Sequence, residues 1–240
     1  MQSGLELAHR TEVDGQHVAR CLRLIWQDED TRKFIQVGVL WELATPAYAF
    51  EYTDGAQHER FVPLPEFPDR QKLYVTPQLP AFFANRVMSS RRESYGDYVG
   101  WLGIADVPTP VEILARRGGG RSTATFPVVA GFAPVNGQVS GRFFASGIRH
   151  LPGAQDRLEQ LMPGDFLRLR QEPGNSVNSK AVLLDKDPGQ PVGYVPDWLL
   201  ADLYHLGLDH VGVRVERVNR DAPAHLRLLC DLSGEVPADQ

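Results

Sequence analysis

Apolar and polar residues alternate over much of the chain, as they do in half-buried β-strands. In the first half, the stretches 18–27 and 33–43 flank the acidic turn DEDTR and predict a hairpin. The stretch 47–56 alternates in the same way and ends in Asp-Gly, a frequent turn. The following FVPLPEFP has too many prolines for a central strand or a helix interior. Apolar residues at helical spacing then predict short helices at 80–92, 94–104 and 111–117.

The second half contains more and shorter strands. A strand followed by a Gly-Ile-Arg-His corner occupies 140–151. We expect further strands at 166–171, 180–185, 191–196, 210–219 and 224–232, and helices at 154–162 and 198–206. Asp197 is expected to cap the second of these helices. Short strands around a few short helices predict a small, strongly bent sheet or open barrel of OB-like style.

The glycine run GGGRS at 118–122 suits a flexible connector between two parts of the chain. We therefore expect a sheet-and-helix module at 1–122 and a β-barrel domain at 123–240. The predicted fold class is mainly β with short helices (α+β), with a small sheet and packed helices in the first module and a small OB-like barrel in the second. A hydrophobic content of 42% is sufficient for a buried core.

Charge and cysteine usage narrow the classes of function. The net charge is −5 and neither half is basic, so the chain is not expected to coat duplex nucleic acid through bulk charge. Its two cysteines, Cys21 and Cys230, lie in apolar stretches without a CxxC motif, which favours buried thiols over a zinc site. No apolar run approaches the roughly 20 residues of a membrane span, and the first residues lack a signal-peptide core. We expect a cytoplasmic protein without a metal or another cofactor.

Catalytic signatures are weak. The sequence has no GxSxG nucleophile elbow, and GGGRS lacks the lysine of a phosphate-binding loop. Asp185, Asp187, Asp202 and Asp209 are too scattered for the tight cluster of a two-metal nuclease. We therefore expect no enzyme activity, and keep a metal-dependent nuclease as an alternative.

The loop EPGNSVNSK, between two predicted strands, is the main candidate for binding. Asn175 and Asn178 could close the loop on its own backbone, or they could contact phosphates and base edges, as could Lys180. Arg149 offers a planar guanidinium for phosphate, or it could pair with Asp165 or Glu172. The full set of candidate nucleic-acid ligands is Arg149, His150, Arg168, Arg170, Asn175, Asn178, Lys180 and Tyr194. Arg168 and Arg170 share a strand face, and the rings of His150 and Tyr194 could stack on bases, although Tyr194 could equally be a half-buried strand residue.

Three blocks in this half, GIRH, GDFLRLRQEPGNSVNSKAVLLD and PVGYVP, resemble the HIRAN domain over about residues 140–235. The resemblance implies a compact barrel related to OB folds. In eukaryotic members, this domain sits on fork-remodelling DNA translocases and grips the 3′ end of single-stranded DNA. By position, Arg149 and His150 fall on the Arg-aromatic corner of the family, and Asn175 and Asn178 fall on the loop that contacts the terminal nucleotide. Tyr194 takes the variable place after Val-Gly.

Three positions depart from the family pattern. His150 replaces the aromatic residue that stacks on a base, and Asn178 replaces the acidic residue that receives the terminal hydroxyl. Asp197 stands where a basic residue is common, and its carboxylate would repel a nearby phosphate. A histidine ring can still stack, and an asparagine oxygen can still accept a hydrogen bond from a hydroxyl.

The first half contains a Val-Gly-x-Leu strand, then FEY, PLPEFP and LPAFFANRVM, and over about residues 34–104 it resembles the N-terminal subdomain of HipA-type kinases. No kinase catalytic region follows, so the resemblance implies a protein-interaction module with a protein partner. Together the two halves suggest recruitment to single-stranded DNA or DNA ends in repair, phage defence or a toxin–antitoxin system. The alternative is an antitoxin-like protein-interaction module without nucleic-acid binding.

Overall fold

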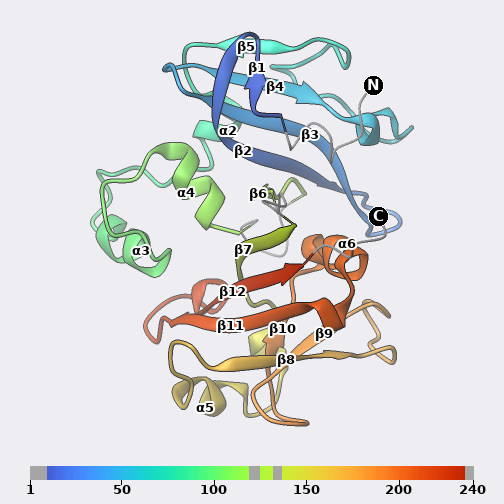
Figure 1. The fold of residues 1–240 in the computed structure, drawn as a ribbon, viewed down its shortest axis with the longest axis vertical. Helices are drawn as coiled ribbons and strands as arrows, with labels where there is room; N and C mark the ends of the chain where they lie inside the picture. The colour runs from blue at the N-terminus through green and yellow to red at the C-terminus, as the bar shows by residue number, and fades with distance from the viewer. Residues whose placement is uncertain (1–9, 119–124, 132–136, 236–240) are drawn as a thin grey trace. The chain divides into compact units, whose positions relative to one another are not determined.

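The computed structural model describes residues 10–118, 125–131 and 137–235. The chain divides into two compact units (Figure 1). Unit 1 comprises Met1–Tyr95 and Val107–Ala133, and unit 2 comprises Gly96–Asp106 and Pro134–Gln240. Each unit is built around its own β-sheet, so the expected mainly β fold with short helices is confirmed.

Unit 1 contains a six-stranded antiparallel sheet. Its strands are β1 (Glu12–Val13), β2 (Gln16–Gln27), β3 (Phe34–Leu43), β4 (Tyr48–Tyr52), β5 (Tyr74–Thr76) and β6 (Val128–Ala130). Strands β1 to β5 follow one another in sequence order, and β6 pairs with β2. The predicted first hairpin is confirmed, because β2 and β3 pair from Val18 opposite Leu43 to Gln27 opposite Phe34. The strand expected at 47–56 is β4, and it gives way to a short 3₁₀-helix at Asp54–Gln57.

Two helices add apolar side chains to the core of unit 1. These are α2 (Ala81–Ala84) and α4 (Pro110–Arg116), and Phe83, Val111 and Leu114 pack with the sheet residues. Helix α4 begins where the sequence predicts, with Thr109 accepting a hydrogen bond from the Glu112 backbone N–H at 3.2 Å.

Helix α2 is much shorter than the helix predicted at 80–92. Arg86 donates from its guanidinium to the Phe82 carbonyl at 2.5 Å, and this guanidinium lies 3.6 Å from the centre of the Phe82 ring. That carbonyl is the group that the Arg86 backbone N–H would take in a continuing α-helix. The N–H bonds instead to the Phe83 carbonyl, three residues back, and the α-helical ladder ends. Apolar spacing alone could not predict this competition.

Unit 2 contains the second sheet, also of six antiparallel strands. They are β7 (Gln138–Phe144), β8 (Phe166–Gln171), β9 (Val182–Asp185), β10 (Pro191–Tyr194), β11 (Val211–Val218) and β12 (Leu228–Glu235). Their order is β10-β9-β8-β11-β12-β7. Ser146, just after β7, exchanges two backbone hydrogen bonds of 2.9 Å with Tyr194 of β10. This bridge joins the two edges of the sheet and closes it into the predicted small, OB-like barrel.

Helices cover parts of unit 2. They are α3 (Tyr95–Trp101), α5 (Ala154–Glu159) and α6 (Asp197–Leu206), with 3₁₀-turns at Ile148–His150, Leu208–His210 and Ala224–Leu226. Helix α6 buries Trp198, Leu199, Leu203 and Leu206, as its spacing predicts. The predicted cap is wrong, because Pro196 is the N-cap residue and Asp197 already lies in the first turn. The Asp197 carboxylate instead accepts a hydrogen bond from a distant loop, described below.

The division of the chain differs in two places from the boundary expected near residue 122. Strand β6 pairs within unit 1, although it follows the glycine run. The segment Gly96–Asp106 joins unit 2, where Asn219 donates to the Trp101 carbonyl at 2.9 Å and Arg217 donates to the Gly100 carbonyl at 3.2 Å. The glycine run itself lies almost entirely outside the described residues.

Both thiols are free. Burial raises the pKa of Cys21 to about 12, and it raises the pKa of the fully buried Cys230 as well, which favours the protonated thiol over the thiolate in both. Within the described residues, no helix has the length and apolar character needed to cross a membrane.

Candidate nucleic-acid interface

The Gly-Ile-Arg-His corner follows β7 and lies against Tyr194. Gly147 has φ of +65°, and a Cβ atom built on it would stand 2.6 Å from the Tyr194 ring. The ring therefore rests directly on the corner backbone, which only glycine permits here. Ile148 is buried and anchors the turn, so that Arg149 and His150 point to solvent.

Tyr194 also contacts the loop between β8 and β9. Its phenolic oxygen lies 3.0 Å from Oε2 of Glu172, and Nδ2 of Asn175 donates to the same carboxylate oxygen at 2.6 Å. Burial raises the pKa of Tyr194, and its hydrogen bond to Glu172 raises it further, so the phenol remains protonated and donates. Tyr194 thus connects the arginine corner on one side with the asparagine loop on the other, through contacts within unit 2.

The two loop asparagines act first on their own backbone. Oδ1 of Asn175 accepts hydrogen bonds from the backbone N–H groups of Val177 at 2.9 Å and Asn178 at 3.0 Å. Oδ1 of Asn178 accepts one from Lys180 at 2.9 Å. The loop-closing alternative is therefore confirmed for both residues, as expected of Asx turns.

Helix α6 holds the far side of the loop. Nδ2 of Asn178 donates to Oδ1 of Asp197 at 2.9 Å, and the Tyr204 hydroxyl donates to the Lys180 carbonyl at 3.0 Å. These contacts pre-order the loop before any ligand arrives. They also place the Asp197 carboxylate directly beside Asn178, a contact that the sequence did not predict.

The candidate cations differ in how far they are already paired. Arg170 makes a bidentate contact with Asp185, at 2.6 and 3.1 Å, and this hydrogen bonding raises its pKa. Its charge is therefore largely neutralised, because the carboxylate of Asp185, which is only 2% exposed, binds it through both oxygens and otherwise accepts only from the Gly189 backbone N–H at 3.3 Å among the described contacts. Arg149 donates to the His150 ring at 3.1 Å rather than pairing with Asp165 or Glu172. Among the described residues no ion pair involves Arg149, Arg168 or Lys180, all of which are exposed.

Strand register places these groups on one face. Arg170 lies opposite Leu183, and Leu183 lies opposite Tyr194, so the three side chains point to the same side of the β8-β9-β10 sheet. Arg168, two residues earlier on β8, shares that side, as the two-residue period predicts. The face combines an aromatic ring, exposed cations and a pre-ordered loop.

Sequence reasoning missed the central part that two carboxylates have in this arrangement. Glu172 binds Tyr194, which is 22 residues further along the chain, and Asp197 binds Asn178, which is 19 residues back. The sequence showed Glu172 only as a possible partner of Arg149 and Asp197 only as a departure from a family pattern. Hydrophobic period gives no information about such distant polar pairs.

The comparison with known families addresses the same part of the chain. Residues 138–237 match the HIRAN domain. The match lies within unit 2 and contains the corner, the loop and Tyr194. It supports nucleic-acid binding by this unit. It does not extend to residues 1–122, so the resemblance of that part to HipA-type kinases remains a prediction.

Solved structures and curated proteins add little to the HIRAN match. The crystal structure of the HIRAN domain of human HLTF is similar, at 20% sequence identity, with 41% of this chain and 81% of that chain covered and a TM-score of 0.31. No curated protein matches the chain.

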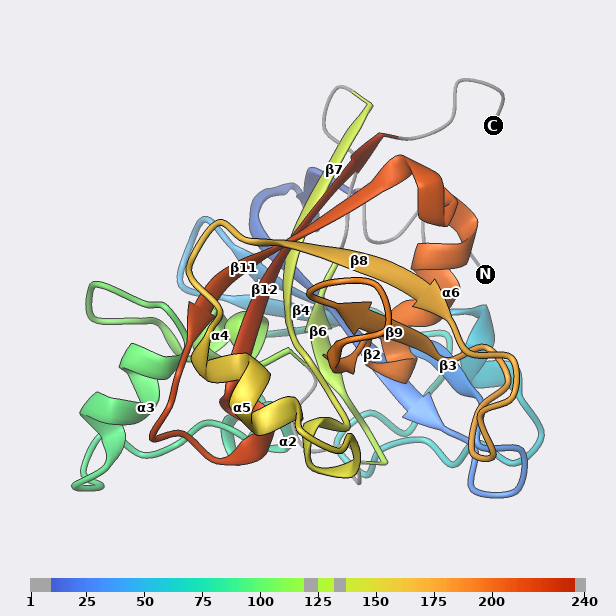
Figure 2. The ribbon, with the colours of Figure 1, turned by 90° about the horizontal axis from the view of Figure 1, so that it is seen from below.

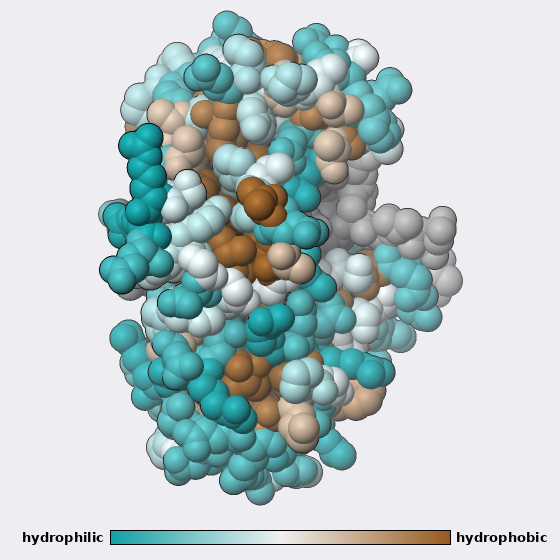
Figure 3. Space-filling view, turned by 90° about the vertical axis from the view of Figure 1, so that its left-hand side faces the viewer, coloured by the Kyte–Doolittle hydropathy of each residue, from teal (hydrophilic) through white to brown (hydrophobic). Residues whose placement is uncertain are grey.

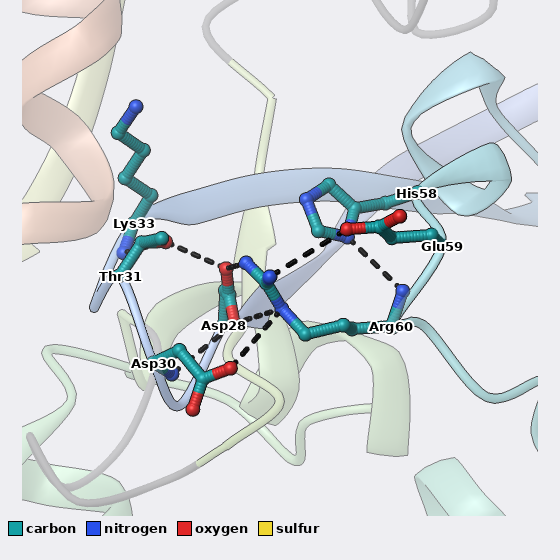
Figure 4. Close-up of polar contacts among 7 residues, drawn as sticks. All are labelled: Asp28, Asp30, Thr31, Lys33, His58, Glu59 and Arg60. Atoms are coloured by element: carbon teal, nitrogen blue, oxygen red, sulfur yellow. Dashed lines mark hydrogen bonds and ion pairs between the residues drawn. The ribbon is translucent and has the colours of Figure 1, made fainter.

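Unit 1 has a polar cluster of its own at the tip of the β2–β3 hairpin (Figure 4). The Arg60 guanidinium binds both carboxylate oxygens of Asp28, and Thr31 donates to Asp28 at 2.6 Å. These hydrogen bonds, with that from Arg60 the strongest influence, hold the pKa of Asp28 well below its ordinary value. Arg60 also lies 3.5 Å from Asp30. Arg60 thus faces three carboxylates, since Glu59 lies 3.7 Å from it as well. We assign the cluster to holding the hairpin tip because Asp28, its buried member, is bound by Arg60 and Thr31.

Within residues 10–118, 125–131 and 137–235, no group of three or more His, Cys, Asp or Glu side chains is placed to hold a metal ion.

Proposed function

We propose that this chain is a non-catalytic protein that binds single-stranded DNA at a 3′ end through unit 2. The observation that carries the proposal is the position of Tyr194. Its ring packs on the arginine corner, and its hydroxyl binds the asparagine loop, so both parts predicted to hold a nucleotide border the same residue. The HIRAN match over residues 138–237 supports the same reading.

Three exposed cations would position the phosphates. Arg149 stands at the corner, Lys180 at the end of the loop, and Arg168 on the shared sheet face. Arg170 would contribute less, because Asp185 already holds it. A protein that neutralises two or three phosphates shows a shallow salt dependence, with a slope of about −0.7 per phosphate on single strands. That agrees with an acidic protein that holds a strand end and does not coat long tracts.

Stacking and amide contacts would hold the terminal nucleotide. The rings of Tyr194 and His150 can stack on any base, which is tolerant of sequence. Asn175 and Asn178 would contact the sugar or the base edge by exchanging their present carboxylate partners for the ligand.

The carboxylates of Glu172 and Asp197 would select the chemistry of the end. A carboxylate accepts a hydrogen bond from a hydroxyl and repels a phosphate. Asp197 therefore offers, from helix α6, a charged acceptor beside Asn178, whose own Oδ1 already accepts from the Lys180 backbone N–H. On this reading the acidic groups at the site favour a terminal hydroxyl over a terminal phosphate.

The test is fluorescence anisotropy with a ten-nucleotide DNA that carries a 5′ fluorophore and either a 3′-hydroxyl or a 3′-phosphate. We expect the hydroxyl form to bind more tightly. Arg149→Gln should weaken binding of both and lower the salt slope by about 0.7, whereas Arg91→Gln, an exposed arginine of unit 1, should change neither. Absence of binding, or an Arg149→Gln variant equal to the parent, would overturn the proposal.

A second candidate is a protein-interaction module without nucleic-acid binding. It is favoured by the commitment of both asparagines and of Arg170 to internal partners. The same titration separates the two, because this alternative predicts no anisotropy change with either oligonucleotide. A metal-dependent nuclease is the third candidate, and it predicts cleavage of the labelled DNA when Mg²⁺ or Mn²⁺ is added.

Unit 1 would couple the DNA-binding unit to another protein. We propose that the HipA-like module, delimited from the sequence as 1–122 and lying mostly in unit 1, mediates protein contacts, and that the barrel module at 123–240 follows it. The setting would be DNA repair, phage defence or toxin–antitoxin regulation in the cytoplasm. Affinity capture with the full chain and with a chain carrying substitutions in unit 1 would identify the partner.

A further inference from the structure

Phe166 is unusual among the apolar side chains of this protein. On the face drawn in Figure 3, hydrophobic residues form small patches separated by hydrophilic ones. Phe166 is 62% exposed, and it is the one aromatic residue among the large exposed hydrophobic side chains of the described part of the chain. A ring that is left in water on a regular strand calls for an explanation, because burial of an aromatic side chain is normally strongly favourable.

A neighbouring arginine holds the Phe166 ring in position. Phe166 of β8 lies opposite Arg214 of β11, and the Arg214 guanidinium carbon stands 3.9 Å from the ring centre. Such cation–π contact fixes the ring and the planar guanidinium against each other. No ion pair of Arg214 is present among the described residues, so its charge remains available.

The same face continues to the proposed DNA end site. Phe166, Arg168 and Arg170 alternate on the exposed side of β8, and β8 runs directly into the loop that carries Asn175 (Figure 2). From Arg170 to Phe166 the strand advances about 13 Å. That span exceeds the rise of about 3.4 Å between stacked nucleotides, so a strand whose end lies at Tyr194 reaches Phe166 only with several further nucleotides.

The charges around the ring favour a polyanion. Arg168 and Arg214 are exposed cations, and the neighbouring Arg142 is already paired with Glu216 at 2.7 Å. Asp231 lies opposite Arg214 on β12 and is the opposing carboxylate on this face. Two available cations thus flank the ring against one carboxylate.

We propose that Phe166 and Arg214 form a second stacking platform, on which an internal base of a bound single strand lies while Arg168 contacts the intervening phosphate. Aromatic rings and guanidinium planes are the surfaces on which unpaired bases stack. This inference rests on the proposed function, because it extends the path of a strand whose 3′ end is held at Tyr194. It assigns a role to Phe166 and Arg214, which the end site does not use, and extends the role of Arg168.

Oligonucleotide length tests the platform. Three-nucleotide and ten-nucleotide oligothymidylates with 3′-hydroxyl ends are titrated into the full chain and into Phe166→Leu, which keeps an apolar side chain but removes the ring. We expect the parent to bind the longer DNA more tightly. The Phe166→Leu variant should lose about tenfold in affinity for it and little for the shorter one. Arg214→Gln should act in the same direction.

Val62→Ala, an exposed apolar residue of unit 1, serves as the matched control and should change neither affinity. In a Phe166→Trp variant, added ten-nucleotide DNA should quench fluorescence more than in the parent.

The outcomes separate the two proposals. If neither oligothymidylate binds the parent, the proposed function fails. If both bind equally and Phe166→Leu is silent, the platform is wrong while the end site stands. If Phe166→Leu keeps full affinity for the longer DNA and Phe166→Ala loses it, the contact is apolar without stacking, and the platform is again overturned.

Discussion

The phenolic oxygen of Tyr194 donates a hydrogen bond to Oε2 of Glu172 at 3.0 Å, and this contact links strand β10 to the loop that follows β8. The ring of the same tyrosine rests on Gly147. One side chain therefore spans the closure of the barrel and the candidate nucleotide site. The packing that closes the barrel and the hydrogen bond that orders the loop therefore both depend on Tyr194. Substitutions that remove only the ring contact or only the hydroxyl distinguish the two effects.

Replacement of Tyr194 by phenylalanine should keep the ring on Gly147 and remove the hydrogen bond to Glu172. We expect a loss of about 1–2 kcal/mol in the free energy of unfolding, because the bond is made to a charged but partly exposed carboxylate, and urea denaturation measures it. Affinity for single-stranded DNA should change little, whereas Tyr194→Leu should weaken it severalfold by removing the stacking ring. Equal affinities of the two variants would show that the ring does not stack on a base.

Gly147→Ala should lower the free energy of unfolding of unit 2 by more than the strain that any side chain suffers at a positive φ. Its φ of +65° disfavours any side chain, and the added Cβ would also meet the Tyr194 ring at 2.6 Å. Gly189→Ala is the matched control, because its φ is +77° and no atom lies within 4 Å of the position that the added methyl group would take. Thermal unfolding should show a clearly larger drop for Gly147→Ala, with reduced DNA binding. Equal drops would mean that the corner and Tyr194 are not tightly packed.

Asp197→Asn should alter the preference between DNA ends. The substitution keeps an oxygen for Asn178 but removes the negative charge beside the proposed terminal position. Two unit charges about 4 Å apart in water interact by about 1 kcal/mol, which corresponds to about fivefold in affinity. We expect DNA with a 3′-phosphate to gain about that factor in an anisotropy titration. Asp187→Asn, on an exposed turn of unit 2, makes the same charge change and should leave the preference intact.

Asp28→Asn should destabilise unit 1 in a pH-dependent manner. Contacts with Arg60 and Thr31 depress the pKa of Asp28 in the folded state below the unfolded value of about 4. Its contribution is therefore present above about pH 4 and is lost as the pH falls toward the folded pKa. Calorimetry of parent and variant should show a difference in melting temperature at pH 7 that shrinks below pH 4.

Asp30→Asn, which changes an exposed carboxylate 3.5 Å from Arg60, is the control for Asp28→Asn and should have a small effect at any pH. A difference between parent and Asp28→Asn that grows as the pH falls would contradict the assignment.

Much of the fold could be predicted from local patterns. The β2–β3 hairpin, the final strand pair and the buried side of α6 all follow periods of two or 3.6 residues, and the structure confirms them. The early end of helix α2 could not be predicted, because the Arg86 side chain competes for the carbonyl that would extend the helix. Strand β6 has three residues, too few for a period to show that its partner is β2, about a hundred positions earlier.

The sequence predicted which residue types form the candidate site, but it predicted few of the contacts between them. The turn chemistry of Asn175 and Asn178 follows from their local sequence, and the structure bears it out. The pairing of Arg170 with Asp185 and the contact of Phe166 with Arg214 depend on which strands become neighbours, and in which register.

The sequence by itself determined the longer strands and which of their side chains turn inward, because the alternation of apolar and polar residues follows the two faces of a sheet whatever the distant partner strand is. It also determined how the loop closes, since an asparagine reaches the backbone two or three residues away. Only the tertiary structure decided that Tyr194 meets Glu172 and that Asp197 meets Asn178, pairs separated by 22 and 19 residues. Such pairs form when the closed barrel brings strand ends together. The local spacing of apolar residues does not predict which distant strand ends will meet.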